Sequence, residues 1–177
     1  MKKKERKNIL IVVHHLGIGG GAERIAGEVS KGLVNKGHNV FILTFYNRKE
    51  TYAHGGKVIC LNEKLTNDYF SKFYKMINRA RSIKKTCKEE KIDTVISFMN
   101  DASASAVLSK TIFRNKSRIV ISQRVNPLIQ IKSLIYVTKF LYKKANLVVS
   151  LSRGVENILN KNFNIKKNKD NIQHPGY

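Results

Sequence analysis

The chain has 177 residues, 42% of them hydrophobic, and its apolar runs are too short to span a bilayer, so it is expected to be a soluble globular protein. Its 34 Lys and Arg against 12 Asp and Glu give a formal net charge of +22. An excess of this size favours a polyanionic partner, either nucleic acid or an anionic membrane, unless it only reflects a lysine-rich genome. The cysteines and histidines show no metal-ligand spacing, so no metal is expected.

Short β-branched runs alternate with longer helical patterns along the chain. After a basic tail over residues 1–7, strands are predicted at 8–13, 39–45, 57–61, 94–98, 118–122 and 147–151, with a further strand starting in the last seven residues. Helices are predicted at 22–36, 68–91, 102–112, 127–144 and 153–162. Apolar strands that are each followed by a helix indicate a parallel sheet covered on both faces. We therefore expect residues 8–177 to form one Rossmann-like open α/β domain, with ligands beyond the carboxyl ends of its strands.

The first of these carboxyl ends carries the glycine-rich segment GIGGGAERIA, which runs into a helix. Glycine lets a ligand approach the backbone, and a helix N-terminus favours an anion such as phosphate. Gly17, Gly19 and Ala22 match a dinucleotide-binding fingerprint. The second strand ends without the acidic residue that binds an NAD ribose, which leaves Arg48 for an NADP phosphate. An NADP-binding Rossmann domain of a reductase is therefore one alternative.

The longer string GGAERIAGEVSKGLVNKGHNVFILT closely resembles the opening of the family 4 glycosyltransferases, which have the GT-B fold. Similar segments follow in order: DTVISFMNDAS, RIVISQRVNP, NLVVSLSRGVEN and NIQHPGY, the last where the family has its interdomain turn. The resemblance extends from about Asn8 to Pro175. It implies two Rossmann-like domains that face each other across a cleft, of which this chain is the amino-terminal, acceptor-binding one, ending at the interdomain linker.

The resemblance implies a retaining glycosyltransferase that moves a sugar from a nucleotide-sugar to a lipid-linked or oligosaccharide acceptor. The expected pathway is the synthesis of bacterial surface polysaccharide or glycolipid. The carboxyl-terminal domain, which binds most of the nucleotide-sugar, is expected to be missing, so this domain alone is expected to be inactive. No cofactor is expected, because Arg, Lys and helix dipoles stabilise the leaving group in this fold.

The resemblance also implies which residues form the site. Donor-phosphate contacts are expected from Gly19, Gly20 and Gly21, and cleft or acceptor contacts from His15, Asn100, Asp101, Gln123, Arg124 and Ser152. Among these, Asp101 and Arg124 are the candidates nearest the reaction centre, and Gln123 stands where the family often has an acid.

Purely structural roles for the same residues remain open. Asp101 is the only carboxylate expected near this rim, and it either binds an acceptor hydroxyl or caps the following helix. Ser152 is also a possible helix cap. Strand alternation predicts that one of His14 and His15 is buried while the other faces the cleft.

The segment DYFSKFYKMINRARSIKK interleaves aromatic and basic residues, a pattern typical of helices at a membrane surface. We expect Lys72, Phe73, Lys75, Arg79 and Arg81 to form a membrane-binding face. The protein is then cytoplasmic and peripheral at the inner face of the cell membrane. The same charge permits a basic nucleic-acid-binding domain, but the sequence has no RNA-binding signature and no helix-turn-helix, so no specific nucleic acid is expected.

Overall fold

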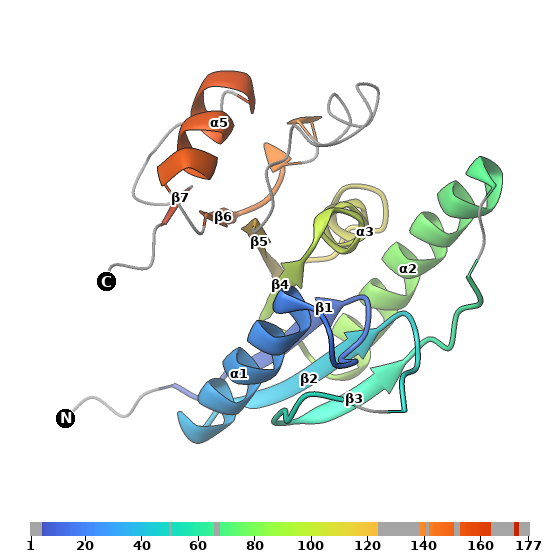
Figure 1. Cartoon of the computed structure of the whole chain (residues 1–177), viewed down its shortest axis with the longest axis vertical. Helices are drawn as coiled ribbons and strands as arrows, with labels where there is room; N and C mark the ends of the chain where they lie inside the picture. The colour runs from blue at the N-terminus through green and yellow to red at the C-terminus, as the bar shows by residue number, and fades with distance from the viewer. Residues whose placement is uncertain are drawn as a thin grey trace.

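The computed structural model describes residues 5–49, 51–65, 68–123, 139–140, 142–150, 153–163 and 172–173. Its strands form one seven-stranded sheet in the order β3-β2-β1-β4-β5-β6-β7, and every neighbouring pair is parallel (Figure 1). The strands are β1 (Asn8–Val13), β2 (Asn39–Thr44), β3 (Lys57–Cys60), β4 (Thr94–Phe98), β5 (Arg118–Gln123), β6 (Leu147–Ser150) and β7 (Ile172–Gln173).

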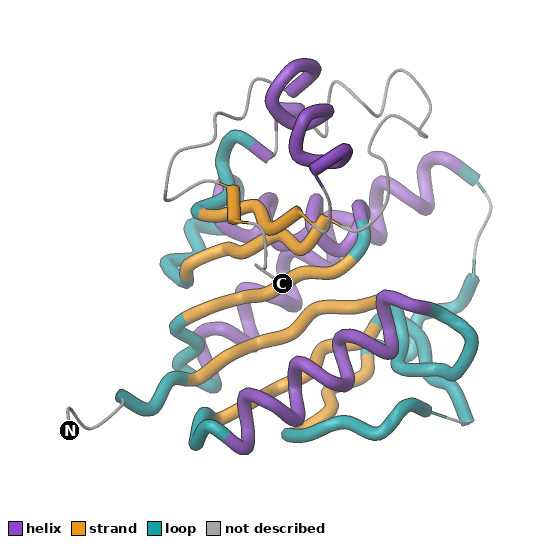
Figure 2. The backbone as a smooth tube through the Cα atoms, turned by 60° about the vertical axis from the view of Figure 1, so that its left-hand side comes forward, coloured by secondary structure: helices purple, strands orange, loops and turns teal. Residues whose placement is uncertain are grey.

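Helices cover both faces of this sheet, as the sequence predicts (Figure 2). One face is covered by α1 (Gly21–Asn35), which packs on β1 and β2. The other face carries α2 (Tyr69–Glu89), α3 (Asn100–Thr111) and α5 (Arg153–Phe163). The Asp68 carboxylate caps α2 by accepting from the Ser71 N–H (2.8 Å).

After Asn8, every residue of the central strand β1 is apolar, and the structure shows why. Leu10 and Val12 belong to the core between the sheet and α2, α3 and α5. Ile11 and Val13 belong to the core beneath α1. Because successive side chains point to opposite faces, a strand covered on both sides needs apolar residues at every position.

Most predicted elements are confirmed to within a residue or two at their ends. The start of α3 differs by two residues: the helix begins at Asn100 rather than at Ala102, because Met99, with φ of +73°, forms its N-cap. The predicted helix over residues 127–144 lies mostly outside the described residues. In the described part of the chain, no helix is both long and apolar enough to cross a membrane.

Candidate functional site

The glycine-rich loop over residues 14–20 connects the end of β1 to the first turn of α1. The neighbouring Tyr52 holds this loop in place. Its backbone N–H donates to the Leu16 carbonyl (2.8 Å), and its hydroxyl accepts from the Gly19 N–H (3.1 Å). The Gly19 amide is therefore already occupied by the protein.

Three consecutive glycines, Gly19 to Gly21, span the end of this loop and the first residue of α1. The fold constrains each of them differently. Gly19 has a φ of +125°, which residues with a Cβ rarely adopt. A Cβ at Gly20 would stand 1.8 Å from the Glu23 carboxylate, so the Glu23 side chain would have to move to accept it. A Cβ at Gly21 would meet nothing within 4 Å. Neither backbone conformation nor packing therefore requires a glycine at position 21.

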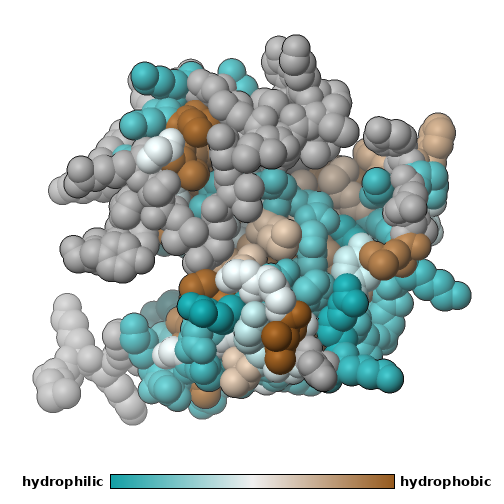
Figure 3. Space-filling model, viewed as in Figure 1, coloured by the Kyte–Doolittle hydropathy of each residue, from teal (hydrophilic) through white to brown (hydrophobic). Residues whose placement is uncertain are grey.

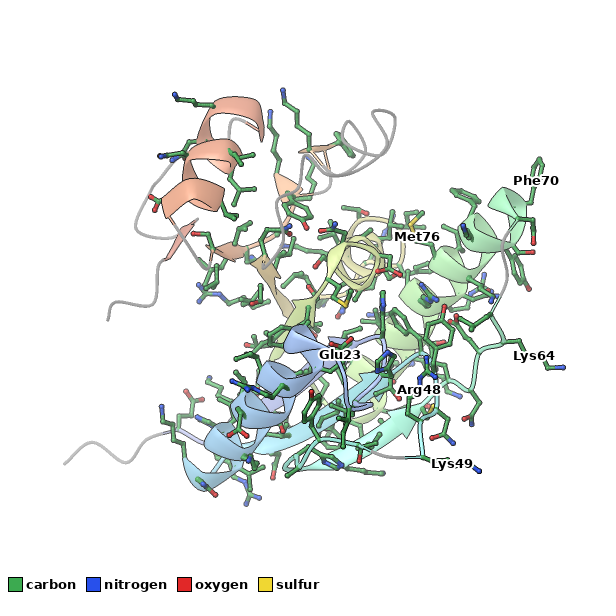
Figure 4. All side chains as sticks on the ribbon, viewed as in Figure 1. Glu23, Arg48, Lys49, Lys64, Phe70 and Met76 are labelled. Atoms are coloured by element: carbon green, nitrogen blue, oxygen red, sulfur yellow. The ribbon has the colours of Figure 1, made fainter. Side chains whose placement is uncertain are left out.

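A pocket of about 620 Å³ opens beside the loop. Arg48 and Lys49 line it from the segment after β2, and Glu23 lines it from the first turn of α1 (Figure 4). The Glu23 side chain is 7% exposed, and its Oε1 lies 3.9 Å from His15 Nε2. Burial lowers the pKa of His15, and Arg48 lowers it further against the opposing effect of Glu23. The pocket thus combines two side chains that are positively charged at pH 7, Arg48 and Lys49, with a helix N-terminus. His15 beside them is neutral at this pH.

A second group of side chains lies at the same sheet edge, around the Arg79 guanidinium of α2. Its Nε and Nη2 donate to the two oxygens of Glu63 (2.9 and 2.7 Å), and its Nη1 donates to Asp101 Oδ2 (3.1 Å). Nη2 also donates to the Tyr46 hydroxyl (2.9 Å), and Cζ lies 4.0 Å from the centre of the Phe45 ring. The Arg79 side chain is only 6% exposed. Hydrogen bonds hold the guanidinium within its plane, and the Phe45 ring packs against its face.

Asp101 links this cluster to the end of β1. Its Oδ1 is hydrogen-bonded to His14 Nε2, and its Oδ2 faces Arg79. Burial acts to raise the pKa of Asp101, but the hydrogen bond from His14 and the charge of Arg79 outweigh it, and the pKa lies below its ordinary value. The Asp101 side chain is 46% exposed, whereas those of Glu63 and Glu23 are 13% and 7% exposed. Asp101 is therefore the most open of these three carboxylates.

Behind Asp101, an enclosed group of polar side chains joins β5 to the start of α3. Gln123 Nε2 donates to Asn100 Oδ1 (3.2 Å), and Gln123 Oε1 accepts from the Tyr142 hydroxyl. Gln123 is 2% exposed, and burial raises the pKa of Tyr142. The prediction that Gln123 lines the cleft is therefore wrong, because its amide is enclosed and hydrogen-bonded at both ends. Asn100 remains partly exposed at the rim.

The structure corrects two expectations about Asp101. Asp101 lies within the first turn of α3 and does not cap it, because Met99 is the N-cap and no side chain caps the helix. It is also not the only carboxylate near the rim, since Glu63 and Glu23 line neighbouring pockets there.

The alternation expected for the two histidines is wrong as well. The side chains of His14 and His15 are 21% and 22% exposed, so neither is fully buried. The reason is that β1 ends at Val13, after which the chain turns and the strand rule no longer applies. His14 faces Asp101, while His15 Nδ1 accepts from the Gly17 N–H (3.0 Å) inside the loop.

The structure thus brings two sets of predicted residues to one sheet edge, Gly19, Gly20, Gly21 and His15 in the loop and Asn100 and Asp101 at the start of α3. Arg124 and Ser152 lie outside the described residues. Sequence reasoning missed Glu63 and Lys49 and misplaced Arg79. Glu63 had a usable signal, because it follows β3 at the same carboxyl edge. Arg79 had none, because one cation in a basic helix looks like the others.

The amino-terminal end of α2 and the loop before it form an exposed surface that we call the α2 tip. It projects beyond the sheet (Figure 1). Its apolar members Leu65, Phe70, Phe73 and Tyr74 are 76%, 91%, 63% and 67% exposed. Lysines at positions 64, 72 and 75 accompany them, and apolar and hydrophilic side chains adjoin on this end of the molecule (Figure 3). Phe70 and Lys64 both point away from the body (Figure 4).

Of the residues predicted to form a membrane face, Lys72 and Phe73 at this end of the helix are exposed and Lys75 is partly exposed, whereas Arg79 is buried. Later turns of α2 pack against the sheet, and Arg79 there is buried in its ion pairs. Arg81 is exposed, and its guanidinium lies 5.5 Å from the centre of the Phe113 ring. Lys72, Phe73 and Lys75 remain on the α2 tip.

Comparisons with known proteins agree with this architecture. The family model described as Glycosyltransferase Family 4 matches residues 19–177. The chain is 31% identical over 171 residues to the N-acetylgalactosamine-N,N'-diacetylbacillosaminyl-diphospho-undecaprenol 4-alpha-N-acetylgalactosaminyltransferase of Campylobacter jejuni, a match that covers 92% of this chain and 46% of that protein.

Two solved structures show the same fold. Sucrose-phosphate synthase from Thermosynechococcus elongatus aligns with a TM-score of 0.74 at 12% identity, covering 96% of this chain and 47% of that one. A glycosyltransferase from Rickettsia africae aligns with a TM-score of 0.63 at 22% identity, covering 96% and 42%. The chain therefore spans less than half the length of each of these three proteins.

Proposed function

The chain belongs to glycosyltransferase family 4, and from this premise we propose that it is the acceptor-side domain of a retaining glycosyltransferase. In this proposal the complete protein moves a sugar from a nucleotide-sugar to a lipid-linked acceptor in bacterial surface polysaccharide or glycolipid synthesis. A second domain supplies most of the nucleotide-sugar site. This domain supplies the acceptor-binding site and part of the contact with the donor diphosphate.

The observation that carries the proposal is the open start of α1 beside two cations. The N–H groups of residues 20–23 donate to no acceptor among the described residues, as is usual for the first turn of a helix. Gly21 leaves open space in one pocket, which it lines together with Gly19 and Gly20. Gly19 and Gly20 also line the adjoining pocket of Arg48 and Lys49. These groups suit a diphosphate, whose negative charge grows as it leaves the sugar, without a metal ion.

Gly21→Ala tests this role of the glycine loop. The methyl group enters open space, so we expect folding to be retained or strengthened by up to about 1 kcal/mol, as for Gly to Ala in a helix. Binding of inorganic pyrophosphate, measured by calorimetry, should weaken by at least about tenfold, because the methyl group blocks the anion from the amides.

Gly32→Ala is the matched control, because Gly32 lies in the same helix, is exposed and also faces open space. It should leave pyrophosphate binding unchanged. Equal binding by the wild type and Gly21→Ala would remove the glycine loop from the donor site.

The lipid-linked acceptor is supported by the α2 tip and by one relative. The Campylobacter jejuni transferase is named for a substrate that carries diphospho-undecaprenol. On this chain, Phe70, Phe73 and Tyr74 have a helical spacing that places them on one side of α2, where they are exposed beside lysines. Aromatic rings with adjoining cations suit the interface of an anionic membrane. We place the protein in the cytoplasm, attached peripherally to the inner face of the membrane.

Vesicle binding tests the membrane proposal. Replacing Phe70 and Phe73 by Ser should lower partition onto vesicles of phosphatidylglycerol and phosphatidylcholine by at least about tenfold, because two exposed rings no longer enter the interface. Binding by the wild type should also weaken with salt and be absent on phosphatidylcholine alone. Sedimentation with the vesicles gives the bound fraction.

Ile112→Ser is the control for this experiment. Ile112 is 53% exposed at the far end of α3, so its loss removes apolar surface without touching the α2 tip. A similar fall in binding for both variants, or stronger binding to a nonspecific oligonucleotide than to vesicles, would count against the membrane.

A further inference from the structure

The charged cluster around Arg79 carries more negative than positive charge. Arg79 faces two carboxylates, Glu63 and Asp101, so these three groups sum to one negative charge when ionised. Glu63 alone would satisfy the guanidinium in a two-point ion pair through Nε and Nη2. The additional bond from Nη1 to Asp101 is therefore not needed to neutralise Arg79.

That additional bond determines where Asp101 points. Asp101 comes from α3, Arg79 from α2 and His14 from the end of β1, so three elements meet at this carboxylate. Among the described side chains, Oδ1 of Asp101 bonds to His14 and Oδ2 to Arg79, so each oxygen keeps a further lone pair beyond these bonds. With 46% of the side chain exposed, these lone pairs remain accessible to a ligand.

We propose that Asp101 binds hydroxyl groups of the acceptor sugar and that Arg79, held by Glu63, is the positioning residue that keeps Asp101 ionised and aimed. This inference rests on the proposed function. An ionised carboxylate accepts hydrogen bonds from sugar hydroxyls and repels phosphate, whereas Arg48 and Lys49 outnumber the Glu23 carboxylate in their pocket and attract phosphate there. The two parts of the rim therefore separate the hydroxyl end of one substrate from the diphosphate of the other.

The other groups that face Asp101 fit this role. His14 Nε2 donates to its Oδ1, because an ionised carboxylate only accepts, and the His14 ring packs against Phe45 at 5.6 Å between centroids. The Tyr46 hydroxyl accepts from Arg79 Nη2 and so restrains the guanidinium from the side of β2. Among the described residues, the buried Tyr142, which donates to Asn100 Oδ1, is a further ionisable neighbour. Protein side chains thus hold Asp101 in place, while its carboxylate remains accessible to a ligand from the solvent.

Nuclear magnetic resonance on the isotope-labelled 177-residue chain tests the inference. The probes are the methyl glycosides of glucose, galactose and N-acetylgalactosamine, with inorganic pyrophosphate as the probe of the glycine loop. At least one glycoside should shift the resonances of the Asp101 carboxylate and the His14 ring. Arg79→Met should weaken the binding of that glycoside by at least about tenfold and raise the pKa of Asp101 measured by titration. The affinity for pyrophosphate should stay within about twofold of the wild-type value.

Arg79→Lys guards against misfolding of the methionine variant. Lysine keeps the positive charge but has one nitrogen, so it cannot hold Glu63 and Asp101 in the same geometry. It should keep the pKa of Asp101 lower than Arg79→Met does while weakening glycoside binding by about threefold or more. Asp93→Asn, an exposed aspartate at the opposite sheet edge, is the control for loss of one negative charge and should change neither probe.

Two results would overturn the inference. One is pyrophosphate binding with no glycoside shift at Asp101 in the wild type. The other is glycoside binding that survives both Arg79 substitutions in a folded protein. Failure of pyrophosphate to bind would instead count against the proposed function, so the two failures are distinguishable.

Discussion

At the scale of single residues, Asp101 couples the stability of the protein to pH. Its pKa is lowered in the folded protein, where His14 and Arg79 stabilise the carboxylate against the cost of burial. The unfolded chain has the ordinary value, near 4. Because the folded pKa is the lower one, this contribution is fully present above the unfolded pKa and is lost as pH falls through the folded pKa.

Asp101→Asn should therefore be less stable than the wild type at pH 7, and the difference should shrink as pH approaches about 3. Urea denaturation at several pH values measures it. Asp93→Asn provides the matched loss of charge at an exposed site. Stability curves for the wild type and Asp101→Asn that stay parallel over this range would show that Asp101 does not have a lowered pKa.

The candidate site could be predicted only in part, and the residues show why. Gly21 and Asp101 follow predicted strands, so the rule that ligands bind beyond the carboxyl ends of strands finds them. Arg79 lies ten positions into a helix, and only the packing of α2 against Glu63 and Asp101 distinguishes it from its basic neighbours. Gln123 follows the same strand rule yet turns inward, because Tyr142 and Asn100 offer it hydrogen bonds that the sequence does not reveal.

At the scale of elements, the segment over residues 51–56 fixes the glycine loop to the sheet. Tyr52 bonds the loop, and the Gly55 N–H donates to Ser30 Oγ on α1 (2.9 Å). At its end, Gly56 has a φ of +91°, and a Cβ there would lie 2.3 Å from the Val40 carbonyl oxygen. Both the backbone conformation and the close approach to β2 exclude a side chain at this position.

Gly56→Ala should lower the free energy of unfolding by about 3 kcal/mol or more, since strain at positive φ and a backbone clash add together. Gly37→Ala is the control, because its φ is +85° but its Cβ would meet nothing within 4 Å. It should cost only about 1 kcal/mol, the strain alone. Urea denaturation compares the two, and equal losses would show that the approach to Val40 relaxes without cost.

The elements themselves were easier to predict than the site, because periodicity is a local property. Residues 9–13 are apolar at every position, which identifies a strand buried on both faces, and the structure confirms both core contacts. The start of α3 was missed by two residues because Met99 adopts positive φ, a conformation that gives no signal in a methionine. The order of the strands in the sheet depends on contacts between distant segments and has no local signal.

At the scale of the whole molecule, most positive charge has no acidic partner available. The chain has 34 basic and 12 acidic residues, and several of the acidic residues are engaged in pairs such as Lys31–Glu28 and Lys57–Glu90. Such exposed pairs contribute little, roughly 0 to 1 kcal/mol each. The dominant electrostatic effect across the molecule is therefore repulsion among its cations, which opposes the compact state and favours an anionic partner.

Raising sodium chloride from about 0.01 M to 0.15 M should therefore stabilise the fold, because the screening length falls from about 30 Å to 8 Å. Two like charges about 10 Å apart in water repel by about 0.4 kcal/mol, so screening many of them should raise the free energy of unfolding by about 1 kcal/mol or more. Urea denaturation at the two salt concentrations measures the change, with an equal osmolarity of sucrose as the control. A loss of stability with salt would show instead that the exposed ion pairs outweigh the repulsion. The same screening should weaken vesicle binding, because it also reduces the attraction of the cations to an anionic surface. Salt should therefore stabilise the fold and weaken membrane attachment.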